Sequence, residues 1–177
     1  MENTATPVTA TAVGIRYGLI TGLIWLIVDF LFRTTGLSFK YAVSIAASLL
    51  VYITGIVMAH RYFKQQNGGF MKYSQGIMIV FFLSLVSGLM SGLFNYVYVN
   101  FIDADYAARM RDDFETWMSS FSGIQEEQIE KGLADMSDEK VKSPMQIGKV
   151  MMGSAIGGVF AGLIVSAFTK KSRPEFE

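Results

Sequence analysis

Four long apolar stretches constrain this chain more than any other feature of its sequence. Charged side chains are almost absent from residues 17–32, 41–59, 76–102 and 150–169, and they cluster between these stretches. A helix needs roughly 20 mostly apolar residues to cross a hydrocarbon layer about 30 Å thick, because each residue advances it by about 1.5 Å. The sequence therefore predicts four transmembrane helices at about residues 15–33, 41–60, 74–102 and 147–170.

The apolar stretches also predict the fold class. Their continuity favours helices over the strands of a membrane barrel, which alternate in polarity. A soluble protein of 177 residues would have too little amphipathic surface to cover four such helices. We expect a single all-α unit over residues 1–177, built as a four-helix transmembrane bundle. A small extracytoplasmic pair of amphipathic helices is expected between the third and fourth spans, in residues 103–146.

The distribution of charge predicts the orientation, because cytoplasmic flanks carry an excess of lysine and arginine. The connection between the second and third spans and the C-terminal tail are both basic. Their basic residues are Arg61, Lys64 and Lys72, and Lys170, Lys171 and Arg173. The connection at residues 103–146 instead holds eleven acids and five basic residues. Arg33 and Lys40 are exceptions, because they lie in the short connection that is expected outside. We nevertheless expect both termini in the cytoplasm and the chain in the inner membrane.

The acidic connection carries a pattern typical of an amphipathic helix. Five of its apolar residues recur at steps of three or four, which places them on one helix face. They are Tyr106, Met110, Phe114, Trp117 and Phe121. Two interpretations stay open. The stripe can pack against the rest of the chain, or it can form a surface that docks a membrane or periplasmic partner or lies in the outer lipid interface.

Two start signals predict further helices in this connection. Ser122 and Gln125 fit a capping box, in which each side chain accepts a backbone N–H of the other residue. The apolar stripe of the helix that would follow is Ile129, Leu133 and Met136. Serine, proline and glutamine within residues 143–146 form the second signal, which predicts that the fourth spanning helix begins before its apolar core.

Small residues recur at four-residue steps in three of the spans. Such rows let helix backbones approach closely in lipid, where burial of apolar side chains drives no association. The glycines concerned are Gly14, Gly18 and Gly22, Gly88 and Gly92, and Gly153, Gly157, Gly158 and Gly162. We expect close packing within one chain. A seam between two copies in a homo-oligomer, or a flexible fourth span, are the alternatives.

Asp29 is the one ionisable residue well inside a predicted span, and a carboxylate at that depth is a functional candidate by default. Arg33 follows four residues later, so a local ion pair is available. Asn95 in the third span is expected at a similar depth and could pair with Asp29. This candidate polar pair serves either structure or the coupling of protons or cations.

Several classes of chemistry have no support in the sequence. The chain has no cysteine and one histidine, His60, which we interpret as a residue of the inner interface. There is no glycine-rich phosphate loop and no nucleophile elbow. The formal net charge is zero, so no nucleic-acid partner is indicated. We expect no enzymatic activity, no cofactor and no metal site.

Three motifs resemble a known family. They are YSQG at residues 73–76, FNYVYVNFIDADY at residues 94–106 and KKSRPEF at residues 170–176. With the four-span layout, they resemble the small bacterial membrane proteins, mainly from Bacteroidetes, grouped as domain of unknown function 4199. That family more often has proline where Ala104 stands. The resemblance implies an inner-membrane location and supplies no activity, so no functional residue is carried over.

Two functions follow as hypotheses. The first is a non-enzymatic scaffold or accessory protein that binds an envelope partner through the helices of residues 103–146. The second is a small transporter or channel subunit that uses Asp29 and Asn95. Because four short spans rarely enclose a transport path, the second hypothesis requires a homo-oligomer.

Overall fold

The computed structural model describes residues 8–172, so the part of the KKSRPEF motif from Arg173 onward lies outside the described residues. Over residues 8–172 every regular element is helical. Four helices are long and apolar enough to cross a membrane. They are α1 (Ala10–Thr35), α2 (Tyr41–Gln66), α3 (Tyr73–Val97) with its π-helical extension η2 (Tyr98–Ile102), and α7 (Met145–Thr169). The expected all-α fold with four spanning helices is confirmed.

Local sequence explains where these helices begin and end. The side chain of Thr9 accepts a hydrogen bond from the backbone N–H of Ala12 at 3.2 Å and so caps α1. Gly36 ends α1 with a φ of 73°, a left-handed conformation that glycine adopts without strain. Gly68 and Gly69 also have positive φ, at 65° and 88°, and they form the turn between α2 and α3.

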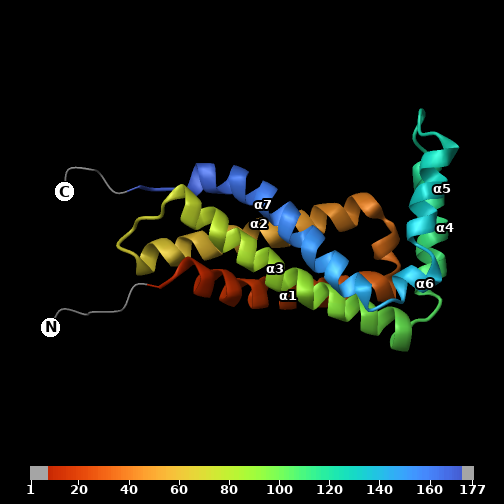
Figure 1. Ribbon diagram of the computed structural model, residues 1–177, viewed down its shortest axis with the longest axis horizontal. Coiled ribbons are helices and arrows are strands. Elements are labelled where there is room, and N and C mark those ends of the chain that lie inside the picture. The colour runs from red at the N-terminus through yellow and green to blue at the C-terminus, as the bar shows by residue number, and fades with distance from the viewer. Residues whose placement is uncertain (1–7, 173–177) are drawn as a thin grey trace.

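α3 is the central helix of the bundle. It packs along α7 on one side and along α1 on the other, whereas α2 packs mainly on α1. Figure 1 shows that α1 begins and α7 ends at the same end of the bundle, which we call the terminal end. The α2–α3 connection lies there too, because Met71 and Lys171 exchange two backbone hydrogen bonds of 2.8 and 2.9 Å. The opposite end is the distal end.

Glycines bring α1 and α3 close together. A Cβ added at Gly14 would lie 2.7 Å from the carbonyl oxygen of Ile79, and one added at Gly18 would lie 2.8 Å from that of Leu83. Gly22 faces the flexible sulfur of Met90. These three glycines share one face of α1. They let the backbones of α1 and α3 approach closely, as their spacing predicts.

The contact between α3 and α7 uses glycines from both helices. Gly92 lies against the backbone of Ile147, and Gly88 lies against Ser154. From α7, Gly158 and Gly162 face Ser84 and Val80. Gly153 and Gly157 form a second row on α7. This row faces away from α3, because a Cβ added at either glycine would meet no atom within 4 Å.

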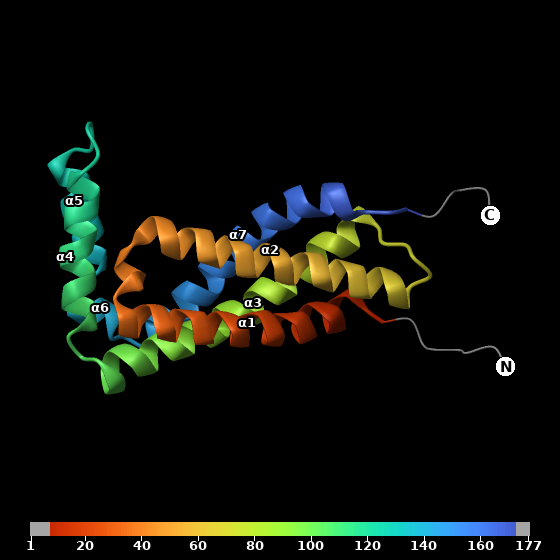
Figure 2. The same cartoon turned by 180° about the vertical axis from the view of Figure 1, so that it is seen from behind.

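Three short helices cap the distal end. They are α4 (Tyr106–Ser119), α5 (Glu126–Asp135) and α6 (Asp138–Val141), and a 3-10 turn η1 (Leu37–Phe39) joins α1 to α2. Figures 1 and 2 show α4 and α5 lying across the end of the bundle instead of along its long helices. We call α4 and α5 together the hairpin. For a bundle that crosses a bilayer, this direction is parallel to the membrane surface.

The start of α5 differs from the prediction. The helix begins at Glu126, and its capping box joins Gln125 to Gln128 instead of Ser122 to Gln125. The reason is Gly123, whose φ of 103° turns the chain and leaves Ser122 outside the helix. α7 begins at Met145, before its apolar core as predicted, and Ser143 Oγ accepts from the backbone N–H of Met145 at 3.2 Å.

Candidate functional site

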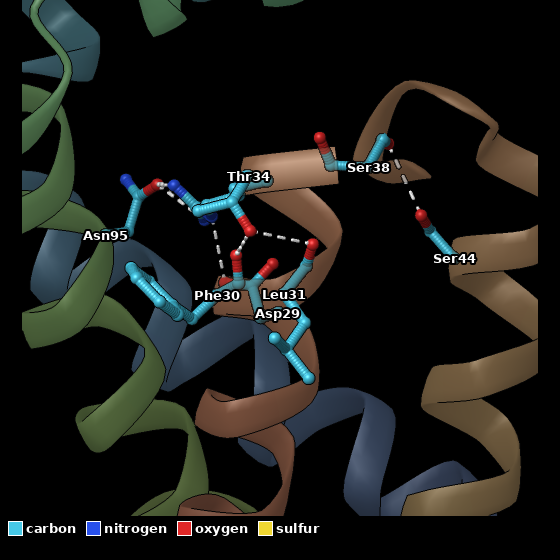
Figure 3. Close-up of polar contacts among 8 residues, drawn as sticks. Asp29, Phe30, Leu31, Thr34, Ser38, Ser44 and Asn95 are labelled. Carbon is cyan, nitrogen blue, oxygen red and sulfur yellow. Dashed lines mark hydrogen bonds and ion pairs between the residues drawn. The ribbon is translucent and has the colours of Figure 1, made fainter. Parts of the chain in front are cut away.

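Arg33 lies at the centre of a polar cluster near the distal end of α1. Its Nε donates to Oδ2 of Asp29, one turn earlier, at 3.0 Å. Both terminal nitrogens of Arg33 donate to Oδ1 of Asn95 on α3, each at 3.1 Å. Figure 3 shows Asn95 reaching from α3 toward the part of α1 that carries Asp29. The candidate pair of Asp29 and Asn95 is therefore brought together through Arg33.

Three aromatic rings surround the guanidinium of Arg33. Its central carbon lies 5.4 Å from the ring centre of Phe94, 4.8 Å from that of Tyr98 and 4.7 Å from that of Tyr106. A cation over an aromatic face is attracted by the ring quadrupole, most strongly where water is excluded. Only 10% of the Arg33 side chain is exposed, so water contributes little to its solvation. The rings come from α3, η2 and α4, and Arg33 thereby ties the hairpin to the bundle.

Hydroxyl groups support the turn that follows this cluster. Thr34 Oγ1 lies 3.1 and 3.0 Å from the backbone oxygens of Phe30 and Leu31, to which it can donate. Ser44 Oγ of α2 donates toward the backbone oxygen of Ser38 in η1 at 3.3 Å. These bonds are visible in Figure 3. Thr34 thus bonds back to carbonyls of its own helix, whereas Ser44 brings a donor from α2 to a carbonyl of the η1 turn.

The first half of the predicted stripe on α4 is covered within the chain. Tyr106 is 5% exposed, and its ring stacks on that of Phe39 in η1 at 5.5 Å. Tyr41, at the start of α2, donates its hydroxyl to the backbone oxygen of Met110 at 3.5 Å. This half anchors the hairpin, so a partner has little access to Tyr106.

The second half of the stripe is more open. Phe114 packs over Gly132 of α5, where an added Cβ would lie 2.7 Å from the ring of Phe114. Trp117 contacts the ring of Tyr41 at 4.9 Å and yet stays 36% exposed. Phe121 contacts Trp117 at 5.0 Å and is 46% exposed. Two large apolar side chains are thus accessible where α4 ends.

Acidic side chains cover the rest of the hairpin surface. Several of its ion pairs, such as Lys131 with Glu127 at 2.8 Å, lie between exposed groups and contribute little stability. Lys140 donates a hydrogen bond to Asp135 at 2.9 Å and lowers the pKa of that carboxyl below its ordinary value. Arg111 pairs with Asp138 of α6 at 3.0 Å and links α4 to α6. The exposed charge is mostly negative.

The terminal end contains a second polar contact that the sequence did not reveal. His60 is fully buried between helices, close to the last residue of α7 and the first turn of α3. Its Nε2 lies 3.1 Å from the backbone oxygen of Gly76, and its Nδ1 lies 2.8 Å from Oγ1 of Thr169. A carbonyl oxygen only accepts, so Nε2 carries the hydrogen. His60 therefore joins α2 to α3 and α7, and its tertiary partners could not be read from its neighbours in sequence.

The polar clusters around Arg33 and His60 hold helices together. Asp29, Asn95 and His60 all have partners within the chain, and no group of three His, Cys, Asp or Glu side chains within residues 8–172 is placed to hold a metal ion. Each cluster instead connects helices that are far apart in sequence. The sequence identified Asp29, its partner Arg33 and the similar depth of Asn95. It did not reveal that Arg33 would bridge the other two residues, because that contact depends on how α1 packs on α3.

Comparison with known proteins gives a family and nothing further. No curated protein and no solved structure matches this chain. A family model described as protein of unknown function (DUF4199) matches residues 16–171, a range that holds most of α1 and all of α2, α3, the hairpin and α7. The match covers well over half of the 177 residues, so this multi-pass membrane protein belongs to the DUF4199 family.

Proposed function

We propose that this protein is a non-enzymatic scaffold or accessory protein of the inner membrane, and that its hairpin docks another protein of the cell envelope. In this proposal the distal end faces outward and both termini face the cytoplasm. The basic residues of the terminal end and the acidic surface of the hairpin favour this orientation. The partner surface lies where α4 ends, and Trp117 of α4 and Phe121 just after it form this surface.

The observation that carries the proposal is the way the hairpin is held. Tyr106 is fixed by Arg33 and Phe39, which sets the position of α4 on the bundle. Trp117 and Phe121 nevertheless keep 36% and 46% of their surface accessible. Rigidly held aromatic side chains lose little entropy on binding, and they are enriched among residues that dominate interface energies. A segment that served only to connect α3 to α7 would need no such anchor.

Site-specific photocrosslinking tests this surface in native membranes. Phe121 is replaced by benzoylphenylalanine, and the matched control carries the same replacement at Phe101. Phe101 is 75% exposed at the same end but belongs to η2 rather than to the hairpin. We expect a discrete protein adduct from position 121 only. Adding Trp117→Ala to the Phe121 variant should reduce its yield severalfold, because Trp117 lies beside the crosslinker.

The same experiment can overturn the proposal. If position 121 forms only lipid adducts, as expected for position 101, the hairpin is an amphipathic membrane anchor and no docking surface. An adduct that forms with equal yield at both positions, or whose yield does not change with Trp117→Ala, would mean that the partner binds at another surface. Both results remove the scaffold role assigned to the hairpin.

The alternative, an oligomeric transporter or channel subunit, requires Asp29 and Asn95 to be available to an ion. Both are engaged by Arg33, whose positive charge repels cations at this position. We therefore expect proteoliposomes with the wild-type protein or with Asp29→Asn to show the same background flux of protons and of sodium ions. A flux present in the wild type and lost in Asp29→Asn would reverse this preference.

A further inference from the structure

The terminal end of the bundle is basic, and within residues 8–172 it carries no acidic side chain. The acids of this range are Asp29 and those of residues 103–139, and all of them belong to the distal half of the molecule. The basic residues of the terminal end are Arg16, Arg61, Lys64, Lys72, Lys170 and Lys171. The described chain therefore offers no carboxylate to balance their charge.

Three of these basic residues line one groove. Its volume is about 300 Å³, and its lining residues are Arg61, Lys64, Gln65, Gly69 and Lys171. Arg61 and Lys64 belong to α2, whereas Lys171 follows α7 and is held beside the α2–α3 connection by its two backbone hydrogen bonds with Met71. Figure 2 shows both segments at the terminal end. Basic flanks that only orient a chain in the membrane need no such convergence of like charges.

The cations of this groove are only partly engaged within the chain. Lys64 Nζ donates to the backbone oxygen of Thr169 at 3.0 Å, and Lys171 Nζ lies 5.5 Å from the ring centre of Phe70. Neither partner carries a negative charge. Arg61 is exposed and makes no hydrogen bond or ion pair with the part of the chain that the structure describes. A guanidinium is always charged and presents a rigid fork of N–H donors, which matches the geometry of a phosphate.

A second groove continues from the first toward the apolar part of the bundle. It shares Arg61 and Gln65 with the first groove, has a volume of about 210 Å³ and is also lined by Met58. Met58 precedes Arg61 by three residues on α2, so the two share a helix face and Met58 lies about one turn deeper. Its side chain is 52% exposed. Positive charge and accessible apolar surface are therefore neighbours, which an anion without an apolar part would not require.

The position of the charges along α2 matches the headgroup layer of a bilayer. The charge-free stretch of α2 ends at Ala59. At about 1.5 Å per residue, Arg61 lies about 3 Å and Lys64 about 8 Å beyond Ala59. The polar layer on each side of the hydrocarbon core is roughly 5–8 Å thick. The groove therefore opens at the depth of lipid phosphates.

We propose that this groove binds the phosphate of an anionic phospholipid, and that an acyl chain of the same lipid lies along Met58. The guanidinium of Arg61 donates to the phosphate oxygens, and Lys64 and Lys171 add positive charge around them. Basic pockets between membrane helices bind anionic headgroups in this way. The proposal is independent of the hairpin and of the side of the membrane that the terminal end faces.

Mass spectrometry of the full-length protein, released intact from detergent micelles, counts bound lipids and gives their apparent affinities. The probes are dioleoyl phosphatidylglycerol and, as the neutral comparison, phosphatidylcholine with the same acyl chains. Arg61→Gln removes the charge and keeps a polar side chain, and Lys171→Gln is a second variant of the groove. Lys72→Gln is the matched control, because Lys72 is exposed at the same end and lines neither groove.

We expect one phosphatidylglycerol to bind about 10-fold more tightly than phosphatidylcholine. Arg61→Gln should weaken phosphatidylglycerol binding by about 3- to 10-fold and leave phosphatidylcholine binding unchanged, because only the charged contact is lost. Lys171→Gln should act in the same direction by about 2- to 5-fold, whereas Lys72→Gln should change the affinity by less than about 2-fold. Excess glycerophosphoglycerol, the same headgroup without acyl chains, should fail to displace the lipid.

Any of three results would contradict the proposal. Equal affinity for the two lipids would mean that only acyl chains are recognised. An equal loss with Arg61→Gln and Lys72→Gln would mean that net charge attracts the lipid and that the groove has no special part in binding. Displacement by glycerophosphoglycerol as effective as that by excess phosphatidylglycerol would mean that the groove takes a soluble phosphate ester instead of a lipid.

Discussion

Arg33→Ala is expected to lower the free energy of unfolding by about 3–5 kcal/mol, the cost of removing one partner from a buried ion pair. The substitution removes the hydrogen bonds to Asp29 and Asn95 and the three aromatic contacts of the guanidinium. It also leaves the Asp29 carboxylate, whose side chain is 18% exposed, without its cation. Unfolding by sodium dodecyl sulfate in mixed micelles, followed by circular dichroism, measures the change.

Arg16→Ala is the matched control, because Arg16 belongs to the same helix and also lies over an aromatic ring. Its Nη1 donates to the hydroxyl of Tyr62 at 2.9 Å, but the side chain is exposed at the terminal end. We expect a loss of less than about 1 kcal/mol there. If both substitutions cost the same, the cluster around Arg33 contributes no special stability.

A second comparison separates the charge of Arg33 from its size. Replacing Arg33 by Met and Asp29 by Leu together removes both charges, so no unpaired charge stays buried. This double variant should recover most of the stability that Arg33→Ala loses. It should not recover the position of the hairpin, because Tyr106 still lacks the guanidinium. Trypsin should therefore cleave after Arg109 and Arg111 faster in both variants than in the wild type.

The spanning helices could be predicted from the sequence because each one depends on a local property. Length, apolar composition and capping residues such as Gly36 act within a single helix, and no tertiary contact is needed to recognise them. The turn at Gly68 and Gly69 is local in the same sense. The predicted start of α5 is wrong by about one helical turn. Ser122 and Gln125 have the spacing of a capping box, but Gly123 between them turns the chain.

The candidate site depends instead on the register between helices. Asn95 meets Arg33 only because Gly18 and Gly22 set how α1 lies along α3, and no pattern within either helix specifies that register. The burial of His60 has the same origin, since its partners come from α3 and α7. Sequence patterns identify the polar residues that lie at depth. Which of them meet is decided by packing.

The glycine contact between α1 and α3 leads to the second large effect. Gly18→Ala should destabilise the protein by about 1–3 kcal/mol, the usual cost of overpacking a well-packed contact. The added Cβ would lie 2.8 Å from the carbonyl oxygen of Leu83 and 3.1 Å from its Cα. These are backbone atoms, so they cannot move aside as a side chain does, and α1 must shift away from α3.

Gly153→Ala should have the opposite sign. The Cβ at this position meets no atom within 4 Å, so the substitution adds no clash and replaces glycine with a better helix former. A gain of up to about 1 kcal/mol is expected. Gly22→Ala should fall between the two, because the atom nearest its Cβ is the sulfur of Met90 at 2.8 Å, which a rotation of that side chain can move.

Detergent unfolding of the three alanine variants measures this order directly. Because every substitution adds the same methyl group to a spanning helix, differences in hydrophobicity and in helix length cancel. Stability should increase from Gly18→Ala through Gly22→Ala to Gly153→Ala. An equal effect at all three positions would mean that α1 and α3 are not in backbone contact. The register that brings Asn95 to Arg33 would then lose its physical basis, since the same contact sets both.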